Sequence, residues 1–206
     1  MIFNFRKTTP FLLLLITACG TTNPPVNSTT DTVTVAQNPP SDSALLQTAT
    51  DATLQALAAK DFNALGQLVH PQKGLLFSPY GYVDTGTAVR LSPEAIQKMF
   101  TTDTAQRKLW GFQDGSGDSL LLTPPAYFRR YVYSRDFKGS DSFHFREIPQ
   151  RGNTLNNLAE VFPEGIVVES YTPGTLEMDW RALRMVFEKT ADKYYLVALV
   201  NDEWTI

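Results

Sequence analysis

The order of apolar and polar residues predicts helices first and strands last in the folded part of the chain. Apolar residues recur at helical spacing over several turns, and Ser43 is the expected cap of this helix. Asp61 is expected to cap a second, short helix that ends before Pro71. The apolar stripe of the first helix consists of Leu45, Ala49, Ala52, Ala56 and Ala59, with Leu46 and Leu57 beside it.

Short strands and proline-marked helix starts alternate in the middle of the chain. Residues 75–77 predict a strand that ends at Pro79, and residues 80–83 are expected to continue it after a bend. Ser92-Pro93 predicts a helix start, because serine caps helices and proline is tolerated at their first position.

A further pair of strands and a third helix follow. The apolar runs 110–112 and 119–122 flank Asp114-Gly115-Ser116-Gly117, whose residue types are typical of a tight turn. Thr123-Pro124-Pro125 predicts the next helix start. The packing face expected for that helix consists of Tyr127, Phe128, Tyr131 and Val132.

The C-terminal part predicts a long hairpin. Residues 166–171 are strand-like, and Leu183, Met185 and Phe187 lie at every second position. A turn at residues 191–193 leads into the apolar strand 194–200. We therefore expect an α+β fold, in which N-terminal helices pack on a curved, mainly antiparallel, cone-like sheet with this hairpin at its centre.

The N-terminus is typical of a secretory signal. Arg6 and Lys7 precede the apolar run 11–16, which is too short to span a bilayer because a spanning helix needs about 20 apolar residues. The single cysteine of the chain follows, and Ile16-Thr17-Ala18-Cys19 resembles the bacterial lipobox. This resemblance implies removal of residues 1–18 and attachment of lipid to Cys19. The alternative is an ordinary signal peptide with a chance cysteine.

Lipid on Cys19 would anchor the protein on the extracytoplasmic side of a cell membrane. Each buried methylene contributes about 0.8 kcal/mol, so two or three acyl chains hold stably. Gly20 lies where an aspartate favours inner-membrane retention in the lipoprotein family, which implies an outer membrane, facing the periplasm, in a Gram-negative organism. The net charge is −3 before Arg6 and Lys7 are lost, so lipid rather than basic charge is expected to attach the chain.

The rest of the chain divides into a tether and one domain. Residues 19–43 are rich in threonine, proline, serine and asparagine and contain no aromatic residue, lysine or arginine. Such a segment buries too little apolar surface to offset the entropy of ordering, so we expect a flexible tether. Residues 44–206 are expected to form a single domain without internal repeats.

Two family resemblances concern this domain. The segment 57–65, LAAKDFNAL, together with the final hairpins resembles the nuclear transport factor 2-like (cystatin-like cone) superfamily. A closer resemblance is to a family of uncharacterised secreted or lipid-anchored bacterial proteins. It rests on HPQKGLLFSPY at 70–80, the turn at 110–117, MDWRALR at 178–184 and EWTI at 203–206. The first resemblance implies a fold that hosts both catalysts and binding modules, and the second implies kinship without an activity.

The candidate catalytic residues are few. His70 precedes Pro71 and is interpreted either as a base at the rim of a cup or as an ordinary helix-end residue. Asp179 and Glu169 are the candidate acid/base partners of His70. These three residues define the enzymatic hypothesis, a hydrolase or isomerase with a cone fold.

Two groups of residues are candidates for ligand binding. Tyr80, Tyr82 and Arg90 flank a glycine-containing loop and would hold a glycan or peptide, or else close one end of the cone. Trp180 and Arg181 would form a platform at a pocket mouth, or else an anchoring tryptophan beside a surface ion pair.

Composition narrows the classes of function. A net charge of −3 without a basic cluster argues against nucleic-acid binding. One cysteine excludes an intramolecular disulfide and a thiolate cluster site, and two histidines leave little for a histidine-rich metal centre. The sequence contains no phosphate-loop or dinucleotide fingerprint, so no cofactor is expected. The leading hypothesis is a non-enzymatic binding or interaction module of the cell envelope. An enzyme and an assembly protein are the alternatives, and the sequence leaves the oligomeric state open.

Overall fold

The computed structural model describes residues 40–204 except 141, 153 and 177, and the signal peptide, Cys19 and most of the expected tether lie outside this part. The helices are α1 (Asp42–Ala59), α2 (Phe62–Leu68), α3 (Pro93–Thr101), α4 (Pro124–Tyr127), the π-helix η1 (Phe128–Val132) and α5 (Leu158–Val161). The strands are β1 (Leu75–Ser78), β2 (Val89–Leu91), β3 (Lys108–Phe112), β4 (Ser119–Leu122), β5 (Ser142–Phe145), β6 (Ile166–Thr172), β7 (Arg181–Thr190) and β8 (Lys193–Glu203). None of the described helices is long and apolar enough to cross a membrane.

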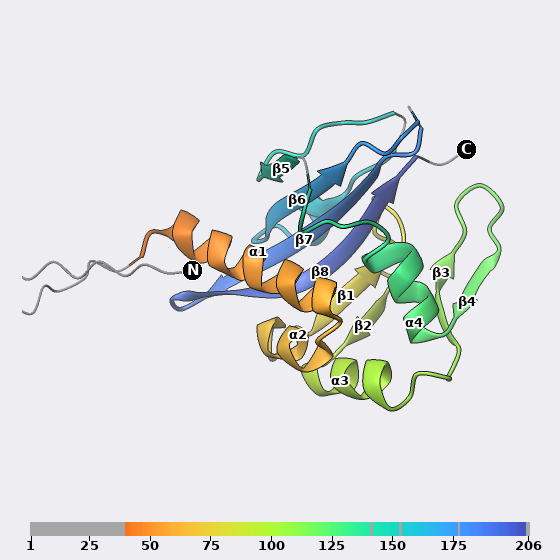
Figure 1. The fold of residues 1–206 in the computed structure, drawn as a ribbon, viewed down its shortest axis with the longest axis horizontal. Helices are drawn as coiled ribbons and strands as arrows, with labels where there is room; N and C mark the ends of the chain where they lie inside the picture. The colour runs from red at the N-terminus through yellow and green to blue at the C-terminus, as the bar shows by residue number, and fades with distance from the viewer. Residues whose placement is uncertain (1–39, 141, 153, 177, 205–206) are drawn as a thin grey trace, which may run out of the picture. The chain divides into compact units, whose positions relative to one another are not determined.

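Helices and a mixed sheet confirm the predicted α+β class. Six strands lie in the order β2-β1-β8-β7-β6-β5, and β3 pairs with β4 in a separate two-stranded sheet. All neighbouring strands are antiparallel except β1 and β8, which run parallel. The β7–β8 hairpin occupies the centre, as expected. Figure 1 shows α1 across β7 and β8, with the β3–β4 hairpin projecting beside α4.

The face of the sheet under α1 carries the main core. Leu183, Met185 and Phe187 of β7 point to this face, because alternate side chains of a strand share a side. An aromatic cluster extends the core toward β3, where the rings of Trp110 and Tyr127 stack with centroids 4.0 Å apart. The expected packing face of the third helix is confirmed, since all four of its residues are buried.

Two predicted helix caps are confirmed and one is wrong. Asp61 Oδ1 accepts from the Ala64 amide at 2.9 Å, and Ser92 Oγ accepts from the Ala95 amide at 3.2 Å. The cap of α1 is Ser41 rather than Ser43, because the helix already begins at Asp42. The first residues of α1 therefore belong to the segment that was expected to be tether.

The buried face of α1 also differs from the predicted alanine stripe. Thr50 and Thr53 are fully buried, whereas Ala59 is exposed. Their hydroxyls donate to the carbonyls of Leu46 and Ala49 at 2.9 and 2.8 Å, so each threonine enters the core with its polar group satisfied. The expected continuation of the first strand over residues 80–83 is also wrong, since the chain bends there after Pro79.

Candidate functional site

A groove lies at the carboxyl ends of β1 and β8, beside the turn of the β3–β4 hairpin. Two adjoining hollows of about 540 and 610 Å³ form it and share five residues, Tyr80, Gln113, Asp114, Gly115 and Glu203. The remaining lining residues are Gly81, Tyr82, Phe112, Gly117, Thr154, Leu155 and Asp202 in the first hollow, and Ser116, Arg130 and Trp204 in the second. We call the two hollows together the groove.

Exposed apolar side chains surround one part of the groove. Tyr82 is 54% exposed, Phe112 43% and Leu155 69%. They come from three separate segments, and they are three of the nine large apolar side chains that are exposed in the described residues. Apolar side chains that gather around one hollow mark an interaction site more often than scattered ones do.

The loop that carries the two tyrosines is fixed by side-chain hydrogen bonds to its backbone. Asn201 Nδ2 donates to the Pro79 carbonyl at 3.0 Å, and Ser78 Oγ donates to the Tyr80 carbonyl at 2.8 Å. Asn157 holds the far end, accepting from the Val83 amide at 2.8 Å and donating to the Val83 carbonyl at 3.0 Å. The two walls that contain Tyr82 and Leu155 are thereby tied together.

Gly81 allows this loop to approach the sheet closely. A Cβ atom at this position would lie 2.9 Å from both Arg184 Nη1 and Asp202 Oδ1, and 3.0 Å from the Leu155 carbonyl. Real Cβ contacts are essentially never that short with so many polar atoms. The loop therefore rests on a buried ion pair at a point where only glycine fits.

The opposite wall is the turn between β3 and β4. The Gln113 amide donates to the Asp118 carbonyl at 2.7 Å, and the Gly117 amide donates to the Gln113 carbonyl at 2.9 Å. Gly115 and Gly117 have φ values of 80° and 72°, which glycine adopts without strain. The predicted tight turn is confirmed, and it places Phe112 and Gln113 at the groove.

Consecutive carboxylates end β8, and each is bound by arginine. Glu203 accepts two hydrogen bonds from Arg130, at 2.7 and 2.6 Å, and its Oε2 lies 3.0 Å from Arg181 Nε. The hydrogen bond to Glu203 raises the pKa of Arg130, more than burial lowers it. Because alternate residues of a strand face opposite sides, Asp202 points to the other face of the sheet.

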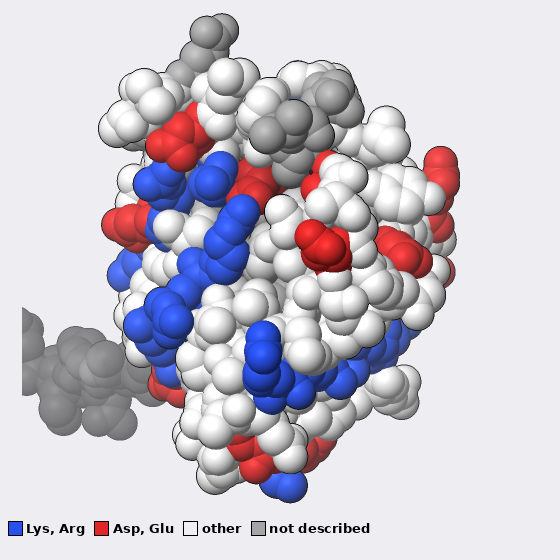
Figure 2. Space-filling view, turned by 90° about the vertical axis from the view of Figure 1, so that its right-hand side faces the viewer, with Lys and Arg blue, Asp and Glu red and all other residues white. Residues whose placement is uncertain are grey.

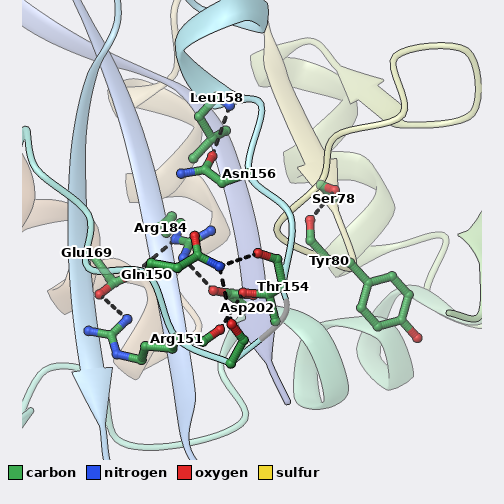
Figure 3. Close-up of polar contacts among 11 residues, drawn as sticks. Ser78, Tyr80, Gln150, Arg151, Thr154, Asn156, Leu158, Glu169, Arg184 and Asp202 are labelled. Atoms are coloured by element: carbon green, nitrogen blue, oxygen red, sulfur yellow. Dashed lines mark hydrogen bonds and ion pairs between the residues drawn. The ribbon is translucent and has the colours of Figure 1, made fainter. Parts of the chain in front are cut away.

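Asp202 belongs to a buried network of charged residues on that face. Arg184 donates to Asp202 through Nη2 and to Glu169 through Nε, the latter at 2.9 Å. Arg151 Nη1 lies 2.6 Å from Glu169 Oε1 and connects the network to the segment that carries Thr154 and Leu155 (Figure 3). Burial raises the pKa of Asp202 to about 6, Arg184 opposes this rise and Glu169 adds to it.

The three candidate catalytic residues have separate partners. His70 is buried, and its Nδ1 accepts from the amides of Gln72 and Lys73 at 3.2 and 3.0 Å, which fixes the turn after α2. Asp179 pairs with Arg135 at 2.6 Å, and Glu169 lies in the Arg184 network. In the described residues, these contacts do not bring the three side chains into one site.

The candidate binding residues are partly brought together. Tyr80 and Tyr82 line the groove, and Arg181 reaches it through Glu203. Trp180 is buried instead, with Arg151 lying 5.9 Å from its ring centroid. Arg90 lies in a different hollow, with Lys73, Glu164 and Glu188, and donates to the Lys73 carbonyl at 2.9 Å.

Sequence reasoning missed Arg130, Asp202 and Glu203. Consecutive acids directly after an apolar strand were a usable signal, because carboxylates at the end of a buried strand need partners. Figure 2 shows the side of the molecule that carries the β3–β4 hairpin, where Lys and Arg side chains form two bands and acidic side chains form separate patches, with uncharged surface between them. No group of three or more potential metal ligands occurs among the described residues.

Comparisons with known proteins place this site in no established family. No protein-family model and no curated protein matches the chain. It is similar to a DUF4783 family protein from Bacteroides ovatus, with 10% identity and a TM-score of 0.33, over 75% of this chain and 94% of that one. It is also similar to Aln2 from a Streptomyces species, with 11% identity and a TM-score of 0.36, over 81% and 94%. TM-scores this low do not establish a shared fold. The family resemblances seen in the sequence therefore stay predictions.

Proposed function

We propose that this chain is a lipid-anchored, extracytoplasmic protein of the cell envelope that binds a glycan or peptide in the groove. The lipobox-like sequence Ile16-Thr17-Ala18-Cys19 supports the lipid anchor. The binding role is carried by one observation, the convergence of exposed Tyr82, Phe112 and Leu155 on a single hollow.

Binding is favoured over catalysis by the state of the carboxylates in the groove. Glu203 is held by Arg130 and Arg181, and Asp202 by Arg184. A general acid or base has to reach the proton that it transfers, whereas both oxygens of Glu203 and Oδ2 of Asp202 already accept from arginine. Their arrangement supports a stable wall for a ligand.

The binding role is tested with detergent-extracted cell walls as the probe. The full-length chain carrying Cys19→Ser is used, so that lipid does not contribute to retention. We expect retention on the walls to be lost when Tyr82→Ala and Phe112→Ala are combined. Phe143→Ala is the matched control, because Phe143 is 38% exposed on β5 and lines neither hollow. Equal retention of the double variant and the control would contradict the proposal.

The anchor has a separate test in cells. Cys19→Ser removes the sulfur that would receive lipid, so the protein is expected to accumulate unprocessed or to leave the membrane fraction. Fractionation unchanged from the wild-type chain would show that lipid on Cys19 is not the anchor.

An enzymatic alternative is favoured by one observation, the raised pKa of Asp202 at the floor of the groove. A carboxyl group that titrates near neutral pH suits a general acid. Turnover of a glycoside or ester substrate that is abolished by Asp202→Asn, in a variant that remains folded, would support this alternative over simple binding.

A further inference from the structure

Two of the carboxylates that line the groove are engaged by arginine. Glu203 pairs with Arg130 and Arg181, and Asp202 pairs with Arg184. A charged ligand would have to compete with these pairs, whereas an uncharged polar ligand would leave them intact.

The walls of the groove suit rings better than an extended chain. Tyr82 and Phe112 come from opposite walls and leave large parts of their side chains exposed. The walls consist of a bend, a turn and a loop, and the strand end at the floor, Asp202 and Glu203, is flanked by β7 and by the loop after β1. An extended peptide that adds to a sheet pairs along a strand, whereas the strands contribute only their last residues to the groove, Phe112 of β3 and Asp202 and Glu203 of β8.

Polar groups for hydroxyl recognition lie between the aromatic side chains. Gln113 supplies an amide at the junction of the two hollows, and Thr154 supplies a hydroxyl on the side of Leu155. Gly117 brings backbone to the groove with open space where a side chain would lie. Such groups donate and accept hydrogen bonds without adding charge.

The groove is also longer than a site for a single sugar ring. Its two hollows share Tyr80 and Gln113 and extend from Leu155 at one end to Arg130 and Trp204 at the other. We infer that the groove binds a short, linear, uncharged glycan, whose sugar rings stack on Tyr82 and Phe112. This inference rests on the proposed function and specifies the ligand class for that site.

The test compares oligomers of similar length that differ in charge and chemistry. Isothermal titration of the full-length Cys19→Ser chain is performed with neutral tetrasaccharides of glucose, mannose, xylose and N-acetylglucosamine. Tetragalacturonate, tetraglucosamine and an uncharged hexapeptide are the comparison probes. We expect saturable binding of at least one neutral tetrasaccharide, with a Kd that does not change as salt is raised, because no ion pair with the ligand is screened.

Variants tie the binding to the groove. Tyr82→Ala and Phe112→Ala are each expected to weaken it about tenfold, since each removes one stacking surface. Phe143→Ala is expected to leave the Kd unchanged. Binding of only the charged oligomers or the peptide, with the same dependence on Tyr82, would overturn the glycan inference and leave the proposed function standing. Binding of no probe would overturn the inference, and cell-wall retention independent of Tyr82 and Phe112 would overturn the proposed function as well.

Discussion

On the face of the six-stranded sheet that carries α1, Leu183, Met185 and Phe187 of β7 are buried among other apolar side chains. On the opposite face of the same strand, Arg184 is equally buried but lies between Glu169 and Asp202. The first face gains stability from apolar burial, which grows with the area removed from water. The second face has a smaller apolar cluster that includes Val186 and Val200, and beside it lie buried charges. Burial alone is unfavourable for these charges, and they persist because each has a partner.

The groove lies beside the face of the sheet that carries Arg184, which we call the charged face. On this face Gly81 approaches Arg184 and Asp202, and Arg151 connects the Leu155 wall to Glu169. The network of ion pairs therefore fixes two walls of the groove relative to the sheet. Apolar contacts are not directional and would fix these walls less specifically. The buried polar groups of this part of the interior orient the walls of the groove.

The strongest test of this comparison removes the arginine at the centre of the network. Arg184→Met keeps much of the volume but leaves Glu169 and Asp202 buried without that cation. We expect the free energy of unfolding to fall by about 3–5 kcal/mol, the usual effect of breaking a buried ion pair from one side. Denaturant titration of the purified chain measures this change.

A compensating variant checks the cause of that loss. Adding Asp202→Asn to Arg184→Met removes the carboxylate that has lost its arginine, while Glu169 keeps its pair with Arg151. We expect much of the lost stability to return, because matched neutral groups are less costly to bury than isolated carboxylates. No recovery would show that packing of the arginine, rather than charge, makes the second face stable.

The next test concerns the apolar face. Leu57 of α1 is fully buried in the main core, and Leu57→Ala is expected to lower the free energy of unfolding by about 2–4 kcal/mol through lost burial and a residual cavity. Ligand affinity in the groove should be unchanged in the folded variant, because α1 contributes no lining residue. An affinity loss comparable to that of Tyr82→Ala would contradict the separation of the two faces.

The sequence predicted the elements whose signals are local. Asp61 and Ser92 cap helices through their own side chains, and the turn at 114–117 follows from its glycines. Tyr80, Tyr82 and Arg90 were predicted as binding candidates because they flank a glycine-containing loop, and the structure places the two tyrosines, but not Arg90, at the groove. Thr50 was not predicted in the core, because its burial depends on a hydrogen bond to its own helix.

The rest of the site depends on contacts between distant segments. Arg130 meets Glu203 across 73 residues of chain, and Asn157 meets Val83 across 74. No spacing rule in one sequence connects such pairs. His70 illustrates the reverse case, since the sequence marks it as chemically capable while its Nδ1 is engaged by backbone amides of its own turn.

The smallest expected effect is the pH dependence of the free energy of unfolding that Asp202, on the charged face, causes. Because the pKa of Asp202 is raised from 3.8 to about 6 in the folded protein, the folded state binds a proton more tightly than the unfolded state. The protein should therefore gain stability as pH falls from about 7 to about 4.5, by on the order of 2 kcal/mol relative to Asp202→Asn. The pKa values of Asp84 and Asp136 are lowered by hydrogen bonds, so the opposing loss that they cause occurs at more acidic pH. Chemical denaturation of both proteins across this range measures the difference, and parallel profiles would show that Asp202 is not the titrating group.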